Sequence, residues 1–306
     1  MTAIPPAAPP LFLKGHGAQN DFIVLPDPEG RLRLLPEEVR YLCDRRTGIG
    51  GDGLLRAVHC TAEPEASTMA GEATWFMDYR NPDGTPAAMC GNGIRVFARY
   101  LVDTDHQRPG TFAIATRAGI RYVHLPTRSR DFHGAVTVLM GRPAFPSGTD
   151  SSIRATAGGH TWPTTHVDMG NPHAVVFVDD LTHPGDLRTP PTVTPASPYP
   201  DGVTVGFVAV RGPRRLTARI HERGVGETRA CGTGACAAVA ATLARSNLRL
   251  NASTPFTVDL PGGSLTVTVN PDGTMELAGP AAIVAQGTLN LTATSPAPER
   301  SPAQVG

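Results

Sequence analysis

The sequence has 306 residues, which is enough for two domains of about 100 to 150 residues, each with its own core. Its 27 basic and 27 acidic side chains cancel and form no sustained basic face, so nucleic-acid binding is disfavoured. Five cysteines, few and odd in number, favour a reducing compartment over a disulfide framework. Because the opening lacks a basic region and no apolar run reaches the roughly 18 residues of a membrane span, we expect a cytoplasmic protein without membrane contact.

The N-terminal part begins with a Pro- and Ala-rich arm, residues 1–10, which offers too little apolar surface to order itself. GHGAQNDFIVLPD (15–27) follows, and its β-branched and aromatic run is typical of a strand. RRTGIGGDG (45–53) is rich in glycine but has no G-x-x-x-x-G-K-[ST] pattern, so a nucleotide loop is discounted.

MCGNGIRVFARYL (89–101) places Cys90 before a glycine turn and a helix-compatible run. In that run Ile94, Phe97, Ala98 and Leu101 are spaced for one apolar face. Further along the chain, two groups of arginines are interpreted as solvated charges rather than a binding footprint: Arg121, Arg128 and Arg130, and the pair Arg214 and Arg215.

The second half contains a Pro-rich stretch, 183–202, which we expect to be a surface loop leading to a strand near Val203. ETRACGTGACAAVAA (227–241) then repeats the cysteine and glycine pattern and predicts a helix over 235–244. Cys231 would lie at the N-terminus of that helix. Free backbone N–H groups and the helix dipole there are expected to lower the pKa of its thiol, although a small buried apolar residue is the alternative. The other three cysteines are interpreted as core or incidental residues: Cys43, Cys60 and Cys236.

Matching segments flank both cysteines in the same order, which indicates an internal repeat. GHGAQNDFIVLPD corresponds to DMGNPHAVVFVDD (168–180). Asn81 and Glu222 each lie nine positions before a cysteine, and FAIATRAG (112–119) corresponds to FTVDLPGG (256–263). The repeat predicts two homologous halves, each made of short strands around one central helix.

Two similar halves with one thiol each suit the inversion of a stereocentre, in which one group removes a proton and another delivers a proton to the opposite face. The ten histidines form no H-x-x-x-H motif and no C-x-x-C pair is present, so a metal site is not expected. Pyridoxal phosphate needs a Schiff-base lysine, and the only lysine, Lys14, lies at the start of a predicted strand. We therefore expect chemistry without a cofactor or metal.

The order G-x-x-N-D-F, N-x-D-G before MCGNG, GNPH and ERGVGET-x-ACGTG resembles the diaminopimelate epimerase family over about residues 11–290. The resemblance implies an α/β (α+β) fold of two pseudosymmetric domains, each a curled, barrel-like, mostly antiparallel sheet around a central helix. It places the N-terminal domain at 1–133, completed by a strand at about 275–290, and the C-terminal domain at 134–274. A flexible tail follows at 291–306.

The same resemblance implies a cofactor-independent isomerase that converts L,L-diaminopimelate to the meso form for lysine and cell-wall synthesis, and that forms a homodimer. Cys90 and Cys231 would be the acid and base pair, with Cys231 as acceptor in the L,L to meso direction. His173 and Glu222 would tune the pKa values of the thiols. The implied substrate contacts are Asn20, Asn81, Gly91, Asn92, Asn171, Thr204, Glu222, Arg223, Gly232 and Thr233.

Some of these residues have ordinary structural interpretations as well. Asn81 and Asn171 lie in turn sequences, and Arg223 beside Glu222 could be a surface arginine. The chain also departs from the family pattern, because Gly53 stands where a substrate-contacting glutamine is frequent and Thr204 where asparagine is usual. The alternatives are therefore an amino-acid racemase of the same fold, a protein that binds small carboxylates without turning them over, or a redox protein.

Overall fold

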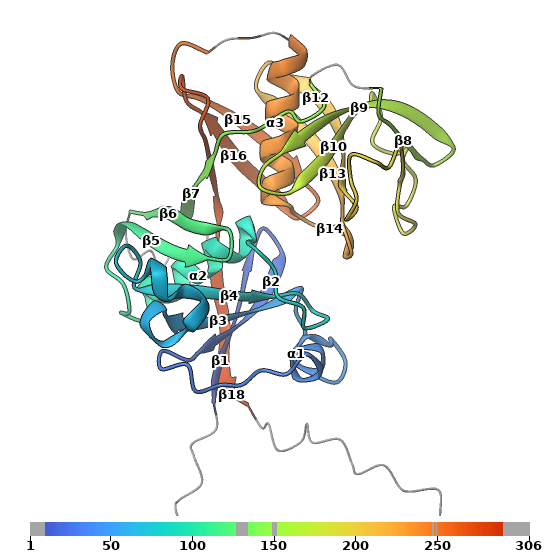
Figure 1. The fold of residues 1–306 in the computed structure, drawn as a ribbon. Coiled ribbons are helices and arrows are strands. Elements are labelled where there is room, and N and C mark those ends of the chain that lie inside the picture. Colours follow the sequence, from blue (N-terminus) through green and yellow to red (C-terminus); the bar gives the residue numbers. More distant parts are fainter. Residues whose placement is uncertain (1–9, 127–133, 149–151, 247, 249, 290–306) are drawn as a thin grey trace, which may run out of the picture.

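The computed structural model describes residues 10–126, 134–148, 152–246, 248 and 250–289. Three predicted features lie outside this part of the chain: the N-terminal arm except for residue 10, the tail at 291–306, and the arginines Arg128 and Arg130. Within it the chain forms two lobes, each with one long helix surrounded by curled sheet (Figure 1). The described residues contain no helix long and apolar enough to cross a membrane.

The N-terminal lobe surrounds helix α2 (Gly91–Asp103). A shorter helix, α1 (Pro36–Cys43), and two 3-10 turns, Cys60–Ala62 and Pro64–Met69, lie in the same half. Its strands are β1 (Leu11–Gly17), β2 (Asn20–Pro26), β3 (Gly53–His59), β4 (Trp75–Arg80), β5 (Gly110–Thr116), β6 (Gly119–Leu125), β7 (Ala135–Gly141) and β18 (Ala282–Thr288).

The C-terminal lobe surrounds helix α3 (Gly232–Ser246), which begins three residues before the predicted helix and ends two residues after it. Its strands are β8 (Arg154–Ala157), β9 (His160–Asp168), β10 (Pro172–Phe177), β11 (Thr192–Thr194), β12 (Thr204–Gly212), β13 (Arg215–Glu222), β14 (Gly226–Thr228), β15 (Thr254–Leu260), β16 (Gly263–Val269) and β17 (Met275–Pro280).

Strand pairing repeats between the lobes, which confirms the predicted pseudosymmetry. In the first lobe β1 to β7 pair in chain order, and only β2 with β3 and β4 with β5 are parallel. In the second lobe β9, β10, β12, β13, β15, β16 and β17 follow the same scheme. The repeated glycines Gly119 and Gly263 close the two equivalent hairpins with φ of 88° and 137°, where glycine avoids the strain that a Cβ would cause.

Two strands join the lobes. β17 pairs with β16 on one side and with β7 on the other, so it belongs to both sheets. The return to the first lobe, predicted for about 275–290, is completed by β18, which begins at Ala282 and pairs with β1. The chain therefore closes the N-terminal sheet with its last described strand.

Both central helices are buried on all sides, unlike the one-sided burial that the apolar spacing after Cys90 predicts. Residues 91–102 of α2 are buried, including Arg95 and Arg99, and so are residues 232–241 of α3. The expectation of a single apolar face is wrong because each sheet curls completely around its helix. Small alanines in α3 let the strands approach closely, and each fully buried large apolar side chain contributes roughly 1.5 to 3 kcal/mol.

The Pro-rich stretch 183–202 is more ordered than the surface loop expected from its composition. It contains β11, which pairs with β8. Leu187 and Tyr199 are buried against Val176 and Phe207. The stretch therefore adds a small apolar cluster beside the C-terminal sheet, and the strand predicted near Val203 begins at Thr204.

Candidate active site

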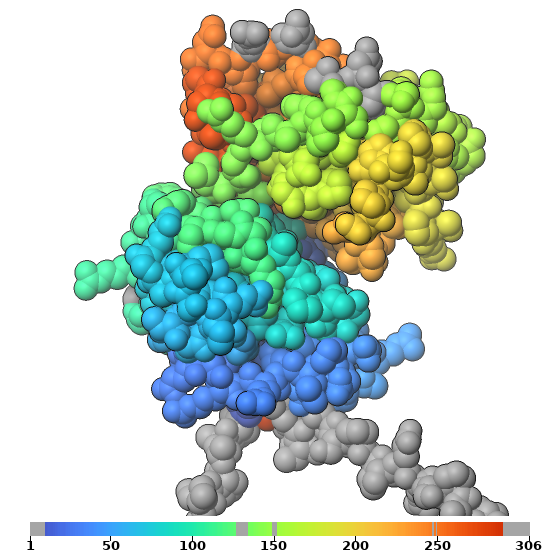
Figure 2. Space-filling view, in the orientation of Figure 1, coloured from blue at the N-terminus to red at the C-terminus, as the bar shows by residue number. Residues whose placement is uncertain are grey.

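The N-termini of α2 and α3 face each other between the lobes and open into one cavity of about 240 Å³. Figure 2 shows the surface of the two lobes, one above the other, in the orientation of Figure 1. The cavity is lined by both thiols and by nearly all the residues predicted to bind substrate: Asn81, Cys90, Gly91, Asn92, Asn171, Thr204, Glu222, Arg223, Cys231, Gly232 and Thr233. Asn20 and His173 lie behind this lining.

The two cysteines have equivalent local geometry. The Cys90 sulfur accepts a hydrogen bond from the backbone N–H of Gly93 at 3.4 Å, and the Cys231 sulfur accepts one from Gly234 at the same distance. Each sulfur thus caps the helix that follows it, at the positive end of the helix dipole. The N–H groups of the first turn at such a helix end favour the binding of an anion.

Glycines let the two helix N-termini touch. A Cβ added to Gly232 would lie 3.3 Å from the Cα of Gly91 and 2.7 Å from a methyl carbon of Leu277. A larger residue at either position would push the two N-termini apart. The sequence pattern shows the glycines in each turn, but not that they pack against each other.

Around Cys90 a chain of amides and charges connects the lobes. Asn20 Oδ1 lies 3.9 Å from the Cys90 sulfur and accepts a hydrogen bond from Asn92 Nδ2 at 3.1 Å. Asn92 also donates to the carbonyl of Ala230 across the lobe boundary at 2.8 Å, and its own oxygen accepts from Arg95 at 2.7 Å. Sequence reasoning missed Arg95, whose signal is a charged residue within a helix that is otherwise apolar.

Around Cys231 the neighbours are a hydroxyl and a carboxylate. Thr233 Oγ1 lies 3.5 Å from the sulfur, and the buried carboxylate of Glu222 is close enough for its charge to add to burial in raising the pKa of the thiol. Thr228 donates to the same carboxylate at 2.5 Å. Burial raises the pKa of Glu222 above its usual value.

The expected lowering of the thiol pKa is wrong for the free protein. Burial, followed by the nearby charge of Glu222, raises the pKa of Cys90 to about 11 despite the helix N–H groups. The same two causes raise the pKa of Cys231 well above its usual value. Desolvation and a like charge therefore outweigh the helix dipole at both positions.

His173 is buried on β10 and its Nε2 lies 3.1 Å from Asn171 Oδ1. Burial and then the neighbouring His166 lower the pKa of His173 to about 3, so its imidazole is neutral at physiological pH. Its direct contact is to Asn171, which lines the cavity. Its predicted tuning of the thiols remains a prediction, and the contact to Asn171 gives it a second possible use.

Arg223 reaches the cavity with a guanidinium that forms no ion pair with any described residue. Its Nη1 donates to the carbonyl of Asp201 at 3.2 Å, and its backbone N–H donates to Thr204 Oγ1 at 3.3 Å. Asn81 combines both interpretations of its sequence, because it closes a turn through Thr85 and also lines the cavity.

Of the cavity-lining residues that were not predicted, two have polar side chains, Tyr79 and Arg121. The interpretation of Arg121 as a solvated charge is wrong, since it is half-buried in β6 and burial lowers its pKa. Nothing local distinguishes it from other strand arginines. Arg215, by contrast, is an exposed charge paired with Asp259 at 2.7 Å. Cys43, Cys60 and Cys236 are buried and lie outside the cavity lining.

Lys14, the lysine considered for a Schiff base, lies outside the cavity lining. Lys14 Nζ forms an ion pair with Asp21 at 2.7 Å and donates to the carbonyl of Gly50, away from the cavity lining. In the part of the chain that the structure describes, no group of three or more His, Cys, Asp or Glu side chains is arranged to hold a metal ion.

Known proteins with similar sequences and structures share this architecture. The family model described as diaminopimelate epimerase matches residues 12–146 and 165–284. A diaminopimelate epimerase of Streptomyces coelicolor is 56% identical over 90% of this chain and 94% of its own. One of Acidothermus cellulolyticus is 39% identical over 92% and 96%.

A solved structure shows the same fold at low identity. The phenazine biosynthesis protein of Bacillus anthracis, of the PhzF family, has a TM-score of 0.68 at 16% identity, covering 92% of this chain and 99% of its own. The family match includes both helix N-termini and the residues that line the cavity. The chain belongs to the diaminopimelate epimerase family.

Proposed function

We propose that this protein is a cofactor-independent epimerase that converts L,L-2,6-diaminopimelate to meso-diaminopimelate. The observation that carries the proposal is that one cavity is lined by two thiols, each at the N-terminus of the central helix of one pseudosymmetric lobe. This arrangement gives an α-carbon held between them a proton acceptor on one face and a donor on the other. The names of the relatives supply the substrate.

In the proposed reaction, the Cys231 thiolate removes the α-proton of the L,L isomer and Cys90 delivers a proton to the opposite face. The electron pair left by the proton is stabilised in the α-carboxylate, which the helix N-termini at Gly91, Asn92 and Gly232 hold with backbone N–H groups. Cys90 ends as the thiolate and Cys231 as the thiol. The reverse reaction exchanges the two roles.

Formation of the first thiolate needs a base, because the pKa of both thiols is raised in the free protein. Glu222 is suited to this task, since its carboxylate is close enough to act electrostatically on the Cys231 thiol and its pKa is raised by burial. Taking that proton would also remove the negative charge that raises the pKa of Cys231. Bound substrate would also displace water from the cavity in which the thiolate acts.

The other end of the substrate carries a second carboxylate and ammonium. The unpaired guanidinium of Arg223 is suited to this carboxylate, and the amides of Asn81 and Asn171 can bind either group. Asn20, behind the lining, contacts Cys90 and accepts a hydrogen bond from Asn92. The hydroxyl of Thr204 accepts a hydrogen bond from the backbone N–H of Arg223 and so helps to fix that residue.

The proposal is tested by proton NMR of L,L-diaminopimelate with reduced protein in D₂O, without added metal or pyridoxal phosphate. Loss of the α-proton signal together with formation of the meso isomer is expected. Absence of both in a folded preparation would reject the proposed reaction, and exchange with another amino acid alone would favour a racemase of different specificity.

Arg223 separates the two substrates. An Arg223→Met variant is expected to raise KM for diaminopimelate by about a hundredfold, because the variant loses a charged hydrogen-bond donor to the distal carboxylate. Arg245, which covers the ring of Phe177 away from the cavity, supplies the matched Arg245→Met control. Unchanged kinetics for Arg223→Met would favour a substrate with a single carboxylate.

Three further expectations accompany this proposal. The domain division at 133 and 134, with the strand at about 275–290 returned to the first domain, can be tested by expressing the parts separately. The homodimer implied by the family can be tested by light scattering at several protein concentrations. The cytoplasmic location can be tested by fractionation of the source cells.

A further inference from the structure

Tyr79 is a cavity residue that the sequence analysis did not select. It lies near the end of β4, and its ring packs edge-on against Phe22 with the centroids 6.1 Å apart. It lines the same cavity as Cys90, Asn81 and Glu222. Its position raises the question of what the phenol does there.

Gly53 makes room for this ring. A Cβ added to Gly53 would lie 2.7 Å from Tyr79 Cε2, 2.8 Å from the carbonyl oxygen of Arg80 and 3.5 Å from the Tyr79 hydroxyl. The Tyr79 ring therefore covers the strand at the position from which a side chain of residue 53 would project. The absence of a side chain at Gly53 and the presence of the phenol are one arrangement, in which the polar group comes from the neighbouring strand.

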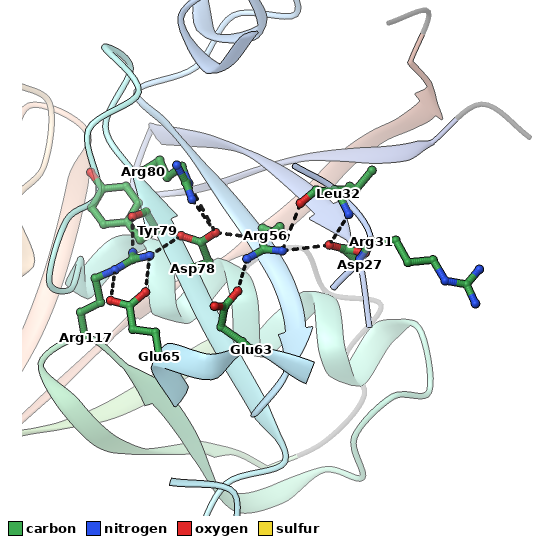
Figure 3. A network of polar contacts seen from close by, with 10 residues as sticks. All are labelled: Asp27, Arg31, Leu32, Arg56, Glu63, Glu65, Asp78, Tyr79, Arg80 and Arg117. Carbon is green, nitrogen blue, oxygen red and sulfur yellow. Dashed lines mark hydrogen bonds and ion pairs between the residues drawn. The ribbon is translucent and has the colours of Figure 1, made fainter. Parts of the chain in front are cut away.

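The backbone of Tyr79 is fixed by a network of ion pairs on β3, β4 and the 3-10 turns (Figure 3). Arg117 donates to the Tyr79 carbonyl at 2.9 Å and to Asp78 at 2.7 Å. Asp78 also accepts from Arg56 at 2.8 Å. Figure 3 shows the Tyr79 hydroxyl at the end of the ring away from Asp78, so the network holds the strand and leaves the hydroxyl free.

The hydroxyl of Tyr79 forms no hydrogen bond with another described residue, while its backbone carbonyl is doubly occupied by Arg117 and Ala87. Burial raises the pKa of Tyr79 well above its usual value, followed by the charges of Cys90 and Glu222. The phenol is therefore protonated at physiological pH and carries one O–H donor that the protein itself does not use.

We propose that Tyr79 is a substrate-positioning residue whose hydroxyl donates a hydrogen bond to a carboxylate oxygen of the bound amino dicarboxylate. This inference rests on the proposed function. A fixed phenol next to Cys90 limits the orientations that the substrate can take before proton transfer, with little loss of side-chain entropy. The specificity contact that the sequence lacks at Gly53 is thus supplied by β4.

The test is Tyr79→Phe, which removes only the oxygen and keeps the ring that covers Gly53. Tyr122→Phe is the matched control, because Tyr122 is exposed, lies outside the cavity lining and donates to Glu72 on the surface. For Tyr79→Phe we expect KM for L,L-diaminopimelate to rise about tenfold or more, with a smaller change in kcat and the same melting temperature as the wild type. Tyr122→Phe should match the wild type in all three quantities.

Binding measured by calorimetry in a Cys90→Ala background provides a second readout without turnover. There the added Tyr79→Phe change should raise the dissociation constant of L,L-diaminopimelate by the same factor as it raises KM. An unchanged KM and dissociation constant would overturn the role of Tyr79. Wild-type turnover in the same assay separates the two proposals, because an inactive wild type overturns the proposed function, whereas an active wild type with an unaffected Tyr79→Phe overturns only this inference.

Discussion

Cys90 and Cys231 cap their helices through the same backbone geometry, but their side-chain surroundings differ. Cys90 is half-buried and faces an amide chain, Asn20 and Asn92, that continues to the carbonyl of Ala230 in the other lobe. Cys231 is 4% exposed and faces a hydroxyl and the carboxylate of Glu222. The repeat thus preserves the helix mouth while the neighbours of each thiol have diverged.

This difference has a chemical consequence. A carboxylate that can take a proton lies next to Cys231, whereas the side-chain hydrogen-bonding neighbour of Cys90 is the amide of Asn20. The pseudosymmetric site is therefore asymmetric in the groups that can take up or release a proton. Such asymmetry suits a reaction that starts with one thiolate and one thiol. Four predictions break or sharpen the comparison, from the largest expected effect to the smallest.

Removal of either thiol tests what the two mouths share. Cys90→Ala and Cys231→Ala should each reduce epimerisation by about a thousandfold or more, since each removes one of the two proton-transfer groups. Chiral chromatography of the products measures this. Cys60→Ala, at a buried cysteine outside the cavity lining, is the control and should retain activity. Substantial turnover in either of the first two variants would contradict a two-thiol mechanism.

Glu222→Gln tests what only the Cys231 side has. The variant keeps the shape and a hydrogen-bond acceptor but loses the carboxylate, so we expect kcat to fall about a hundredfold. Loss of the negative charge should also lower the pKa of Cys231, because Glu222 is the second cause of its raised value. The pH dependence of alkylation of Cys231 should accordingly move to lower pH. An unchanged kcat together with an unchanged alkylation profile would show that Glu222 takes no part in proton transfer at Cys231.

The equivalent residues Asn92 and Thr233 should differ in their effect on stability. Asn92→Ala removes the hydrogen bonds that Asn92 makes to the Ala230 carbonyl, to Asn20 and to Arg95, so we expect the free energy of unfolding to fall by about 1 to 3 kcal/mol. Thr233→Ala loses one weak contact to sulfur and should cost under about 1 kcal/mol. Urea unfolding of both variants decides this, and equal losses would show that the bridge between lobes does not depend on Asn92.

Alkylation of the free wild-type protein should distinguish the two thiols by rate. With a pKa of about 11 for Cys90 and a strongly raised value for Cys231, both react slowly at pH 7 and faster as the pH rises above 9. Cys90 should react several times faster than Cys231, because it is also more exposed. Peptide mass spectrometry after iodoacetamide treatment measures each site. Faster reaction at Cys231 would reverse the comparison.

The same pKa shifts give the sign of a stability effect. A thiol whose folded pKa is raised keeps its proton more strongly in the folded state, so its contribution to stability is fully present below pH 9 and is lost as the pH rises from 9 toward the folded value. The free energy of unfolding should therefore fall through this range. The buried thiols of Cys43 and Cys236, whose pKa values are raised to about 12, add to the same trend.

The sequence was most informative where the chemistry is local. The two Cys-Gly-x-Gly turns and the helices after them were predicted because each depends on residues a few positions apart. The repeat also predicted two homologous halves with one thiol in each. The unusual glycine at Gly53 was visible as well, but not the ring that lies over it.

What only the tertiary structure decided depends on neighbours far apart in the chain. The pKa of each thiol is governed by burial and by Glu222, which outweigh the helix dipole that the sequence made visible. Arg121 and Tyr79 join the cavity because β6 and β4 curl around α2, and no local pattern reports the direction of a strand side chain relative to a distant cavity. The sequence by itself therefore determined the fold family and the two thiols that we propose to react, since both are recognised from short motifs. Folding decided the pKa values of the thiols and which residues line the cavity. Desolvation and charge act between residues that only the packed lobes bring together.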